Sequence, residues 1–411
     1  MTAARRCLYN IPMPRLSQIE GALRSSVFSD LQQAIDAHRA GGGDLIPLHI
    51  GDTHRLPPEA ARYEAACAGG QESLYGYGTT TGLGELRAAI AASLARSGRA
   101  LDGATGERHV LIGVGATHAL SCAARALLDP GDDALIAAPY WPLAHGVLHA
   151  CGARAVEVPL TTRLYADPGL DAGELFREAA TPRTRLLYFI TPNNPDGKVL
   201  DATHLEQIAR FAAERDLWVI ADEVYADYAF DLPHTSIARL PGMGDRTVTA
   251  FSFSKSHALA GARIGYVVAP ERVIAAARKA STHSVFNVPV LMQRAALQAL
   301  EGGDAWLAEV RAEYLATRDV AAAALAGSPA RFWAAEGGTY LFLDFTHLLR
   351  GRPLRLLLEE AVRRGVLLAP GDAFGRDFST WARLCYTSVP VPALREGIAR
   401  LREAMESFER T

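Results

Sequence analysis

The sequence predicts an α/β protein with a large domain built around a mainly parallel central sheet, plus a smaller α+β domain. The chain has 411 residues, more than one typical domain holds. From about residue 85, helical segments alternate with continuously apolar strands, the pattern of a parallel sheet covered on both faces. After about residue 300 this alternation stops. We expect an N-terminal arm with part of the small domain at 1–50, a large domain at 51–300 and a small C-terminal domain at 301–411.

Local periodicity and turn residues predict the individual elements. Apolar side chains recur at helical spacing in 26–40, and the glycines from Gly41 to Gly43 end that helix. Further helices are predicted at 86–96, 116–128, 203–215 (N-cap Asp201 or Thr203) and 305–326. Strands are predicted at 109–115, 134–139, 153–160, 185–190, 217–222, 247–253 and 263–270. The C-terminal part predicts a strand pair within 332–345 and extended segments at 366–375 and 381–389.

Composition and charge exclude several classes of function. The formal net charge is −3 and no basic stripe with interleaved aromatics occurs, which argues against nucleic-acid binding. No run of about 18 apolar residues predicts a membrane span. Residues 1–14 contain no apolar segment after Arg5 and Arg6 and do not resemble a signal peptide. We therefore expect a cytoplasmic protein.

The cysteines and histidines do not predict a disulfide framework or a metal site. The five cysteines are odd in number, irregularly spaced and without a CxxC pair, so reduced thiols are expected. His145 and His149 are four residues apart and could share a helix face, but no third ligand is nearby. No metal is expected.

Three polar residues follow successive predicted strands. Asn194 lies in the turn PNNPDG after RLLYFI, Asp222 ends LWVIAD, and Lys255 lies in SFSKSH after TVTAFSF. Ligands of parallel sheets bind beyond the carboxyl ends of the strands, so these side chains are expected in one crevice. A buried carboxylate keeps a pyridine nitrogen protonated, an amide can hydrogen-bond a phenolate oxygen, and a lysine can form a Schiff base. The combination indicates pyridoxal phosphate.

The sequence also predicts sites for anions. In GVGATH the backbone N–H groups of Ala116 and Thr117 would lie at a helix N-terminus, which favours a phosphate. Arg263, eight residues after Lys255, adds a charge-assisted contact, and Arg383 in ARLCYTSV could pair with a carboxylate. GVGATH lacks the third glycine of the dinucleotide fingerprint, which argues against a nicotinamide cofactor.

Together these motifs resemble the class I/II aminotransferase family of fold-type I pyridoxal-phosphate enzymes. The resemblance runs from about Leu45 to Arg402. It rests on the segments YGTTTGLGELRAAI, GVGATHAL, PNNPDG, ADEVY, SFSKSHALAGARIGY and ARLCYTSV. The segment GDTHRLPP departs from the family's Gly-Glu-Pro-Asp version, which leaves the contacts of His54 and Arg55 open.

The resemblance implies a role for each cofactor-binding residue. Lys255 would form the Schiff base with pyridoxal phosphate and then move the proton between the substrate and the cofactor. Asp222 would pair with the pyridinium nitrogen, and Tyr225 and Asn194 would hydrogen-bond the phenolate oxygen. Trp141 would stack on the ring. The phosphate would be held by Ala116, Thr117, Ser252 and Arg263, and by Tyr77 of the partner in a homodimer with shared active sites.

The resemblance further implies the substrates and the reaction. Arg383 would bind the α-carboxylate, with Asn194 and Gly51 against it, and the reaction would be transamination between an amino acid and a 2-oxo acid. Other pyridoxal-phosphate reactions on the same scaffold stay open, namely those of a β-lyase, a synthase or an amino-acid oxidase. A transcription regulator that binds this cofactor would need a DNA-binding pattern before Leu45, and none is evident.

The amino donor is not predicted. Dicarboxylate-specific relatives present an arginine in the place of His283 to Asn287, and this segment contains none. Its absence weighs against aspartate and glutamate as preferred donors. His257 and His283 could line the cleft or pack elsewhere.

Overall fold

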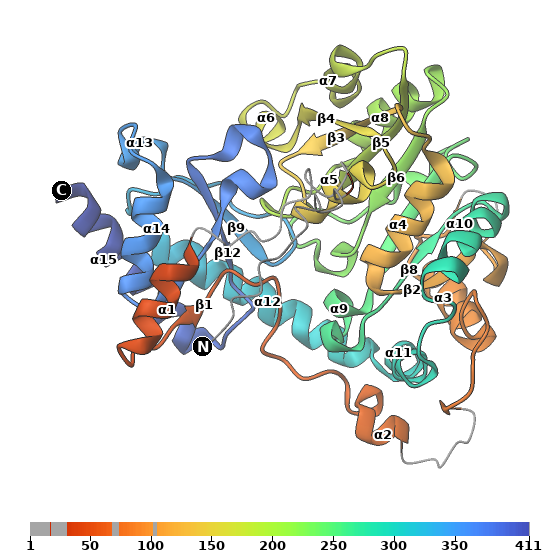
Figure 1. Cartoon of the computed structure of the whole chain (residues 1–411), viewed down its shortest axis with the longest axis horizontal. Coiled ribbons are helices and arrows are strands. Elements are labelled where there is room, and N and C mark those ends of the chain that lie inside the picture. The colour runs from red at the N-terminus through yellow and green to blue at the C-terminus, as the bar shows by residue number, and fades with distance from the viewer. Residues whose placement is uncertain (1–16, 18–30, 68–73, 102–104, 411) are drawn as a thin grey trace, which may run out of the picture.

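A computed structural model describes residues 17, 31–67, 74–101 and 105–410 of the protein. Cys7, most of the N-terminal arm and positions 26–30 of the first expected helix lie outside these residues. Figure 1 shows a larger and a smaller lobe, with the long helix α12 (Asp304–Leu325) extending between them.

The larger lobe is built around a seven-stranded sheet in the order β2-β8-β7-β6-β5-β3-β4. Strand β8 is antiparallel to both neighbours and the other adjacent pairs are parallel. The strands are β2 (Val110–Val114), β3 (Asp133–Ala138), β4 (Arg154–Pro159), β5 (Thr184–Ile190), β6 (Trp218–Asp222), β7 (Thr247–Ser252) and β8 (Ile264–Val268). Because β5, β6 and β7 are parallel, their carboxyl ends meet at one edge of the sheet.

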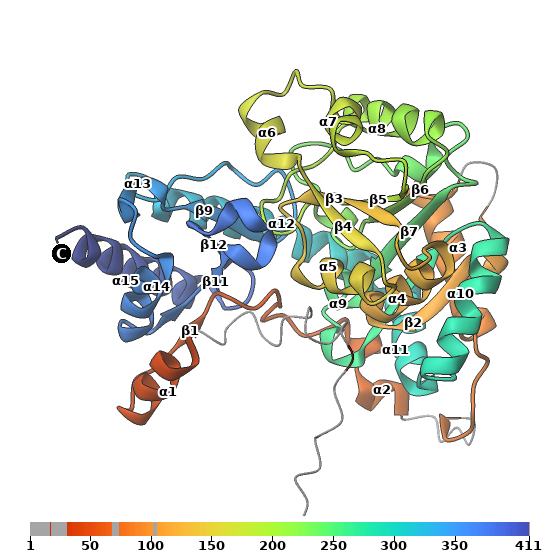
Figure 2. The ribbon, with the colours of Figure 1, turned by 45° about the horizontal axis from the view of Figure 1, so that its top comes forward.

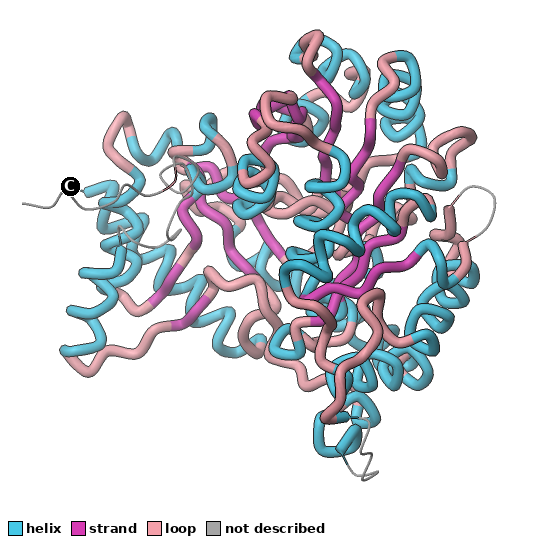
Figure 3. The backbone as a smooth tube through the Cα atoms, turned by 45° about the vertical axis from the view of Figure 1, so that its right-hand side comes forward, coloured by secondary structure: helices cyan, strands magenta, loops and turns pink. Residues whose placement is uncertain are grey.

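Helices cover both faces of this sheet, so its central strands are buried on two sides. Figure 2 shows α7 and α8 on one face and α4, α5 and α10 on the other, and Figure 3 shows the strands enclosed between helices. The helices are α2 (Tyr63–Cys67), α3 (Gly84–Arg96), α4 (Gly115–Leu127), α5 (Pro142–His149), α6 (Thr161–Ala166), α7 (Ala172–Ala179), α8 (Ala202–Glu214), α9 (Phe253–Ser256), α10 (Glu271–Ser284) and α11 (Val290–Gly302).

The smaller lobe combines segments from both ends of the chain. An antiparallel sheet has the order β11-β12-β9, and β1 pairs in parallel with β10. Helix α1 packs beside α14 in one apolar core with α15. These elements are α1 (Gln32–Ala40), β1 (Ile46–Pro47), β9 (Tyr340–Asp344), α13 (Thr346–Leu349), α14 (Leu354–Arg363), β10 (Val366–Leu367), β11 (Ala369–Pro370), β12 (Trp381–Cys385) and α15 (Val391–Arg410).

The expected fold class is confirmed, and Asp201 is the N-cap of α8, accepting a hydrogen bond from the backbone N–H of His204 at 2.9 Å. The expected strand pair within 332–345 is wrong, since β9 is the strand formed there. The backbone before β9 forms hydrogen bonds with the larger lobe and not with a second strand of a pair: Gly337 N–H donates to Gly197 O at 2.9 Å. The domain boundaries at residues 50 and 300 stay predictions. In the described part of the chain, no helix is long and apolar enough to cross a bilayer.

Candidate active site

A cavity of about 370 Å³ lies at the carboxyl ends of β5, β6 and β7, where β9 and β12 approach the large sheet. It brings together eleven of the twelve residues singled out in the sequence, all except Tyr77. These eleven lining residues are Gly51, Ala116, Thr117, Trp141, Asn194, Asp222, Tyr225, Ser252, Lys255, Arg263 and Arg383. The strand ends explain this convergence: Asp222 ends β6, and Ser252 ends β7 just before Lys255 in α9.

One end of the cavity is built for an anion. Helix α4 begins at Gly115, so the first backbone N–H groups of α4, including those of Ala116 and Thr117, have no partner within the helix. Gly115 has φ +73°, and a Cβ there would lie 2.4 Å from Nη2 of Arg263. Gly265 allows β8 to approach the first turn of α4, because a Cβ at position 265 would lie 2.3 Å from the backbone nitrogen of Ala116. The glycines therefore allow a guanidinium and a helix N-terminus to share one corner.

Asp222 and Lys255 face the middle of the cavity. Asp222 is buried, and Oδ2 of its carboxylate accepts a hydrogen bond from Tyr188 OH at 2.8 Å. Burial raises the pKa of Asp222 to about 6, although the Tyr188 hydrogen bond and the Lys255 charge lower it in part. Lys255 Nζ donates to Gly51 O and lies 6.0 Å from the centre of the Tyr225 ring. The lysine is therefore held in the cavity by a neutral acceptor.

Arg383 of β12 occupies the opposite end and is only 8% exposed. Nη1 donates to Asn194 Oδ1 at 2.8 Å and Nη2 donates to His49 O at 2.8 Å. The guanidinium carbon lies 4.2 Å from the Tyr340 ring centre and 5.0 Å from that of Phe374. Two aromatic rings and two oxygen acceptors thus fix a buried guanidinium, which is matched to a carboxylate.

Four charged side chains share this cavity. Arg383, Arg263, Lys255 and Asp222 form no ion pair with any of the residues that the structure describes. Asp222 and Arg383 are buried, whereas Lys255 is half-buried and Arg263 is exposed. A buried charge without a counter-ion is costly, so Asp222 and Arg383 are characteristic of a ligand site.

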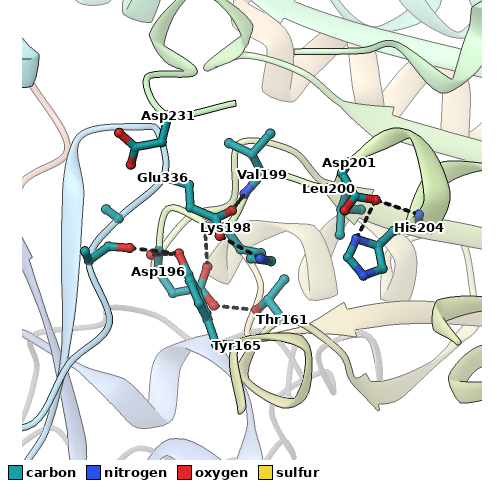
Figure 4. Close-up of polar contacts among 12 residues, drawn as sticks. Thr161, Tyr165, Asp196, Lys198, Val199, Leu200, Asp201, His204, Asp231 and Glu336 are labelled. Carbon is teal, nitrogen blue, oxygen red and sulfur yellow. Dashed lines mark hydrogen bonds and ion pairs between the residues drawn. The ribbon is translucent and has the colours of Figure 1, made fainter. Parts of the chain in front are cut away.

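Buried polar contacts fix the turn that carries Asn194 (Figure 4). Asn193 Nδ2 donates to Asp196 Oδ1 at 2.8 Å. The Thr161 hydroxyl donates to Asp196 Oδ2. Burial raises the pKa of Asp196, and these donors oppose that rise. The turn is consequently tied to α6, and Asn194 is held opposite Arg383.

A second group of contacts ties the same turn to the smaller lobe. Lys198 Nζ donates to Glu336 Oε1 at 2.7 Å, and Val199 N–H donates to Oε2 at 2.9 Å. Lys198 also lies 4.7 Å from the centre of the Tyr165 ring. Lys198 is buried in this network and does not face the cavity.

Residues with undecided roles lie outside the cavity lining. Arg55 forms ion pairs with Glu309 and Glu313 of α12, and His54 lies 3.3 Å from Glu313. His257 is buried and stacks on Trp306 at 6.2 Å, and His283 is exposed on α10. The lining of the cavity includes none of these four residues, His54, Arg55, His257 and His283.

Tyr77 does not reach the cavity of its own chain. Its side chain is 90% exposed and meets Phe286 edge to face, with ring centres 5.1 Å apart. Sequence reasoning missed Tyr340, which lines the cavity from β9. Its segment TYLFLD reads only as an apolar strand, and no motif in the sequence marks the tyrosine.

Comparisons with known proteins agree with this geometry. Residues 43–401 match the family model described as aminotransferase class I and II. The chain belongs to this family. It is 34% identical to an arginine–pyruvate transaminase of Pseudomonas aeruginosa over 88% of this chain and 90% of the relative. It is 33% identical to an aspartate aminotransferase of Pyrococcus abyssi over 93% of this chain and 95% of the relative.

A solved structure of a single mutant of Thermus thermophilus aspartate aminotransferase is also similar, with a TM-score of 0.87 and 28% identity. That likeness covers 95% of this chain and 100% of the other. The protein is thus an aminotransferase, and members of its family depend on pyridoxal phosphate. Among the described residues, no cluster of histidine, cysteine and acidic side chains could hold a metal ion.

Proposed function

We propose that this aminotransferase binds pyridoxal phosphate in the cavity, held covalently by Lys255, and transfers an amino group from an amino acid to a 2-oxo acid. The observation that carries the proposal is the set of four charged side chains that share the cavity without counter-ions among the described residues. The charges of these side chains are opposite in sign to the charges of the cofactor and of an amino-acid substrate that they would meet.

The individual residues fit this cofactor. Asp222 would meet the pyridinium nitrogen, whose positive charge would stabilise a carboxylate whose pKa is raised by burial. Arg263, Ser252 and the N-terminus of α4 would meet the phosphate. Trp141, the N-cap residue of α5, would cover one face of the ring. When bound, the cofactor supplies the electron sink that makes the α-proton of the amino acid removable.

The chain's own residues would orient the reactants and move the proton. Lys255, released from its contact with Gly51 O, would take the α-proton and return it. Tyr225 and Asn194 would donate hydrogen bonds to the phenolate oxygen. Tyr188 would keep the Asp222 carboxylate aimed at the ring nitrogen through its 2.8 Å hydrogen bond.

Arg383 would bind the α-carboxylate that amino acids and 2-oxo acids share. Its two 2.8 Å hydrogen bonds to neutral oxygens leave the positive charge available to a ligand. Gly51 would lie beside that carboxylate, where it has no side chain to obstruct binding.

A donor screen tests the reaction. The relatives named above include enzymes named for arginine and for aspartate, so the family does not specify the donor. Each amino acid is mixed with the pyridoxal form, and conversion to the pyridoxamine form is followed by absorbance. A transaminase converts the pyridoxal form to the pyridoxamine form in stoichiometric amount and releases no ammonia. A lyase or an oxidase on this scaffold instead releases ammonia over repeated turnovers.

We also propose a cytoplasmic homodimer with shared active sites. Tyr77 and Phe286 form an exposed aromatic pair, as a surface that meets a second copy would present. In such a dimer Tyr77 would reach the phosphate bound by the partner. The four described cysteines form no disulfide, in keeping with a reducing compartment.

A further inference from the structure

Tyr340 occupies the junction of the two lobes inside the cavity. It begins β9, where it pairs in register with Cys385 of β12, and its side chain is 1% exposed. Arg383 precedes Cys385 by two residues on β12, so it lies on the same face of the small sheet beside Tyr340. The neighbouring Gly51 makes room for it, because a Cβ at position 51 would lie 1.9 Å from the Tyr340 hydroxyl.

The hydroxyl of Tyr340 meets a residue of the other lobe. The two hydroxyl oxygens of Tyr340 and Tyr225 are 2.6 Å apart, and the rings pack edge to face with centres 5.6 Å apart. Burial, followed by the contact with Tyr340, raises the pKa of Tyr225, so Tyr225 keeps its proton and can act as a donor.

Proton counting then fixes the direction of this hydrogen bond. A phenol has one proton to donate and can accept through its lone pairs. If Tyr225 gives its proton to the phenolate oxygen of the cofactor, only Tyr340 can supply the proton between the two hydroxyls. Tyr340 would thereby polarise Tyr225 and make it a stronger donor, as expected for a chain of hydrogen bonds in a poorly solvated site.

The ring of Tyr340 contacts the second half of the site. The Arg383 guanidinium carbon lies 4.2 Å from its centre, within the range of a cation–π interaction. One side chain therefore contacts both the tyrosine proposed for the cofactor's phenolate oxygen and the arginine proposed for the substrate carboxylate.

We propose that Tyr340 is a positioning residue with two separable parts: its hydroxyl strengthens Tyr225 as a hydrogen-bond donor, and its ring fixes Arg383 for carboxylate binding. This inference rests on the proposed function. It predicts that removing the hydroxyl changes the cofactor's titration, whereas removing the ring also weakens carboxylate binding.

The first test replaces the hydroxyl alone, by Tyr340→Phe in the holoenzyme. The pKa of the Lys255-bound cofactor is read from the pH dependence of its absorbance. The loss of one net hydrogen bond in the chain should raise that pKa by roughly 0.5–1 unit, because the phenolate charge is less well stabilised. Tyr386→Phe is the matched control: Tyr386 is fully buried, and its hydroxyl donates to Gly338 O outside the cavity lining. The control should leave the cofactor pKa unchanged.

The second test separates the ring from the hydroxyl. Propionate, which offers a carboxylate and no amine, is titrated into the holoenzyme and its Kd is read from the same absorbance. Tyr340→Phe should bind propionate with wild-type affinity, and Tyr340→Leu roughly 2- to 30-fold more weakly, as the loss of a cation–π contact implies. Tyr340→Phe conserves the core volume, so the first test stands even if Tyr340→Leu does not fold.

Each outcome has a defined meaning. An unshifted cofactor pKa in Tyr340→Phe would overturn the role of the hydroxyl, and equal propionate affinity in the Phe and Leu variants would overturn that of the ring. Failure of the proposed function would be recognised separately, because the wild-type protein would then show no cofactor absorbance that titrates.

Discussion

Arg383 donates a hydrogen bond from Nη1 to Oδ1 of Asn194 at 2.8 Å. The arginine belongs to the smaller sheet, and the asparagine lies in the turn after β5 of the large sheet. The contact therefore joins the residue proposed for the substrate carboxylate to one proposed for the phenolate oxygen of the cofactor. In the proposed function, substrate recognition and cofactor binding would therefore both depend on how the two lobes meet.

Arg383→Leu should weaken the use of amino acids and spare the cofactor. The loss of a charge-assisted interaction of about 3 kcal/mol lowers kcat/KM roughly 100-fold, mainly through KM. Amines without an α-carboxylate should react as with the wild type, and the cofactor spectrum should persist. Arg376→Leu removes an arginine whose side chain is 70% exposed and serves as the control. Equal damage to both substrate types would make Arg383 structural.

Asp222→Asn should change how the stability of the cofactor-free protein depends on pH. Burial raises the pKa of Asp222 from 3.8 to about 6, so the carboxyl group favours folding below pH 3.8 and this contribution is lost as the pH rises to about 6. The loss is roughly 3 kcal/mol, at 1.36 kcal/mol per unit.

Asp222→Asn should not show this loss. The free energy of unfolding of the variant, minus that of the wild type, should therefore increase from about pH 4 to 6 and then stay constant. Urea unfolding at a series of pH values measures it. The control is Glu223→Gln, for which the same difference should increase up to about pH 8, because burial raises the pKa of Glu223 to about 8. Identical pH profiles for wild type and Asp222→Asn would contradict the assignment.

Glu336→Gln should destabilise the protein more than the loss of an exposed ion pair does. Lys198 has a side chain only 7% exposed, and without Glu336 its charge is buried unpaired, at a cost of about 3 kcal/mol. Glu214→Gln breaks the exposed pair with Arg177 and should cost less than about 1 kcal/mol. Urea denaturation compares the two. Equal effects would show that the Lys198–Glu336 pair does not stabilise the turn carrying Asn194.

Tyr77→Ala and Lys255→Ala should complement each other if the active sites are shared. Each variant alone is expected to be poorly active. A mixed dimer would contain one site with Lys255 from one chain and Tyr77 from the other, and should regain part of the activity. Mixed dimers confirmed by mass, with Tyr77→Ala impaired alone and no recovery on mixing, would place Tyr77 outside the partner's site.

The convergence of Asp222, Ser252 and Lys255 on one cavity could be predicted from the sequence, because their positions depend on local rules. Asp222 and Ser252 end parallel strands, and Lys255 directly follows one, so the topology of the sheet alone brings them together. Gly115 marks the start of α4 through its positive φ, which a glycine adopts at little cost.

Features that depend on how the lobes meet could not be predicted from local sequence. Lys198 and Glu336 are 138 residues apart and pair only after the lobes dock. Tyr340 reads as one more apolar position of a strand until β9 is placed beside Arg383. The strand expected before β9 is wrong for the same reason, since it depends on how the lobes meet. The backbone N–H of Gly337 forms its hydrogen bond with Gly197 of the other lobe.

Mapping the lysine that is covalently bound to the cofactor tests the proposed function most directly. The chain contains only three lysines, Lys198, Lys255 and Lys279, so borohydride reduction followed by peptide mass mapping has few outcomes. We expect a reduced pyridoxyl group on Lys255 and none on Lys198, which is paired with Glu336, or on the exposed Lys279. Lys255→Ala should abolish the label. A label on Lys198 or Lys279, or labelling that persists in Lys255→Ala, would contradict this expectation.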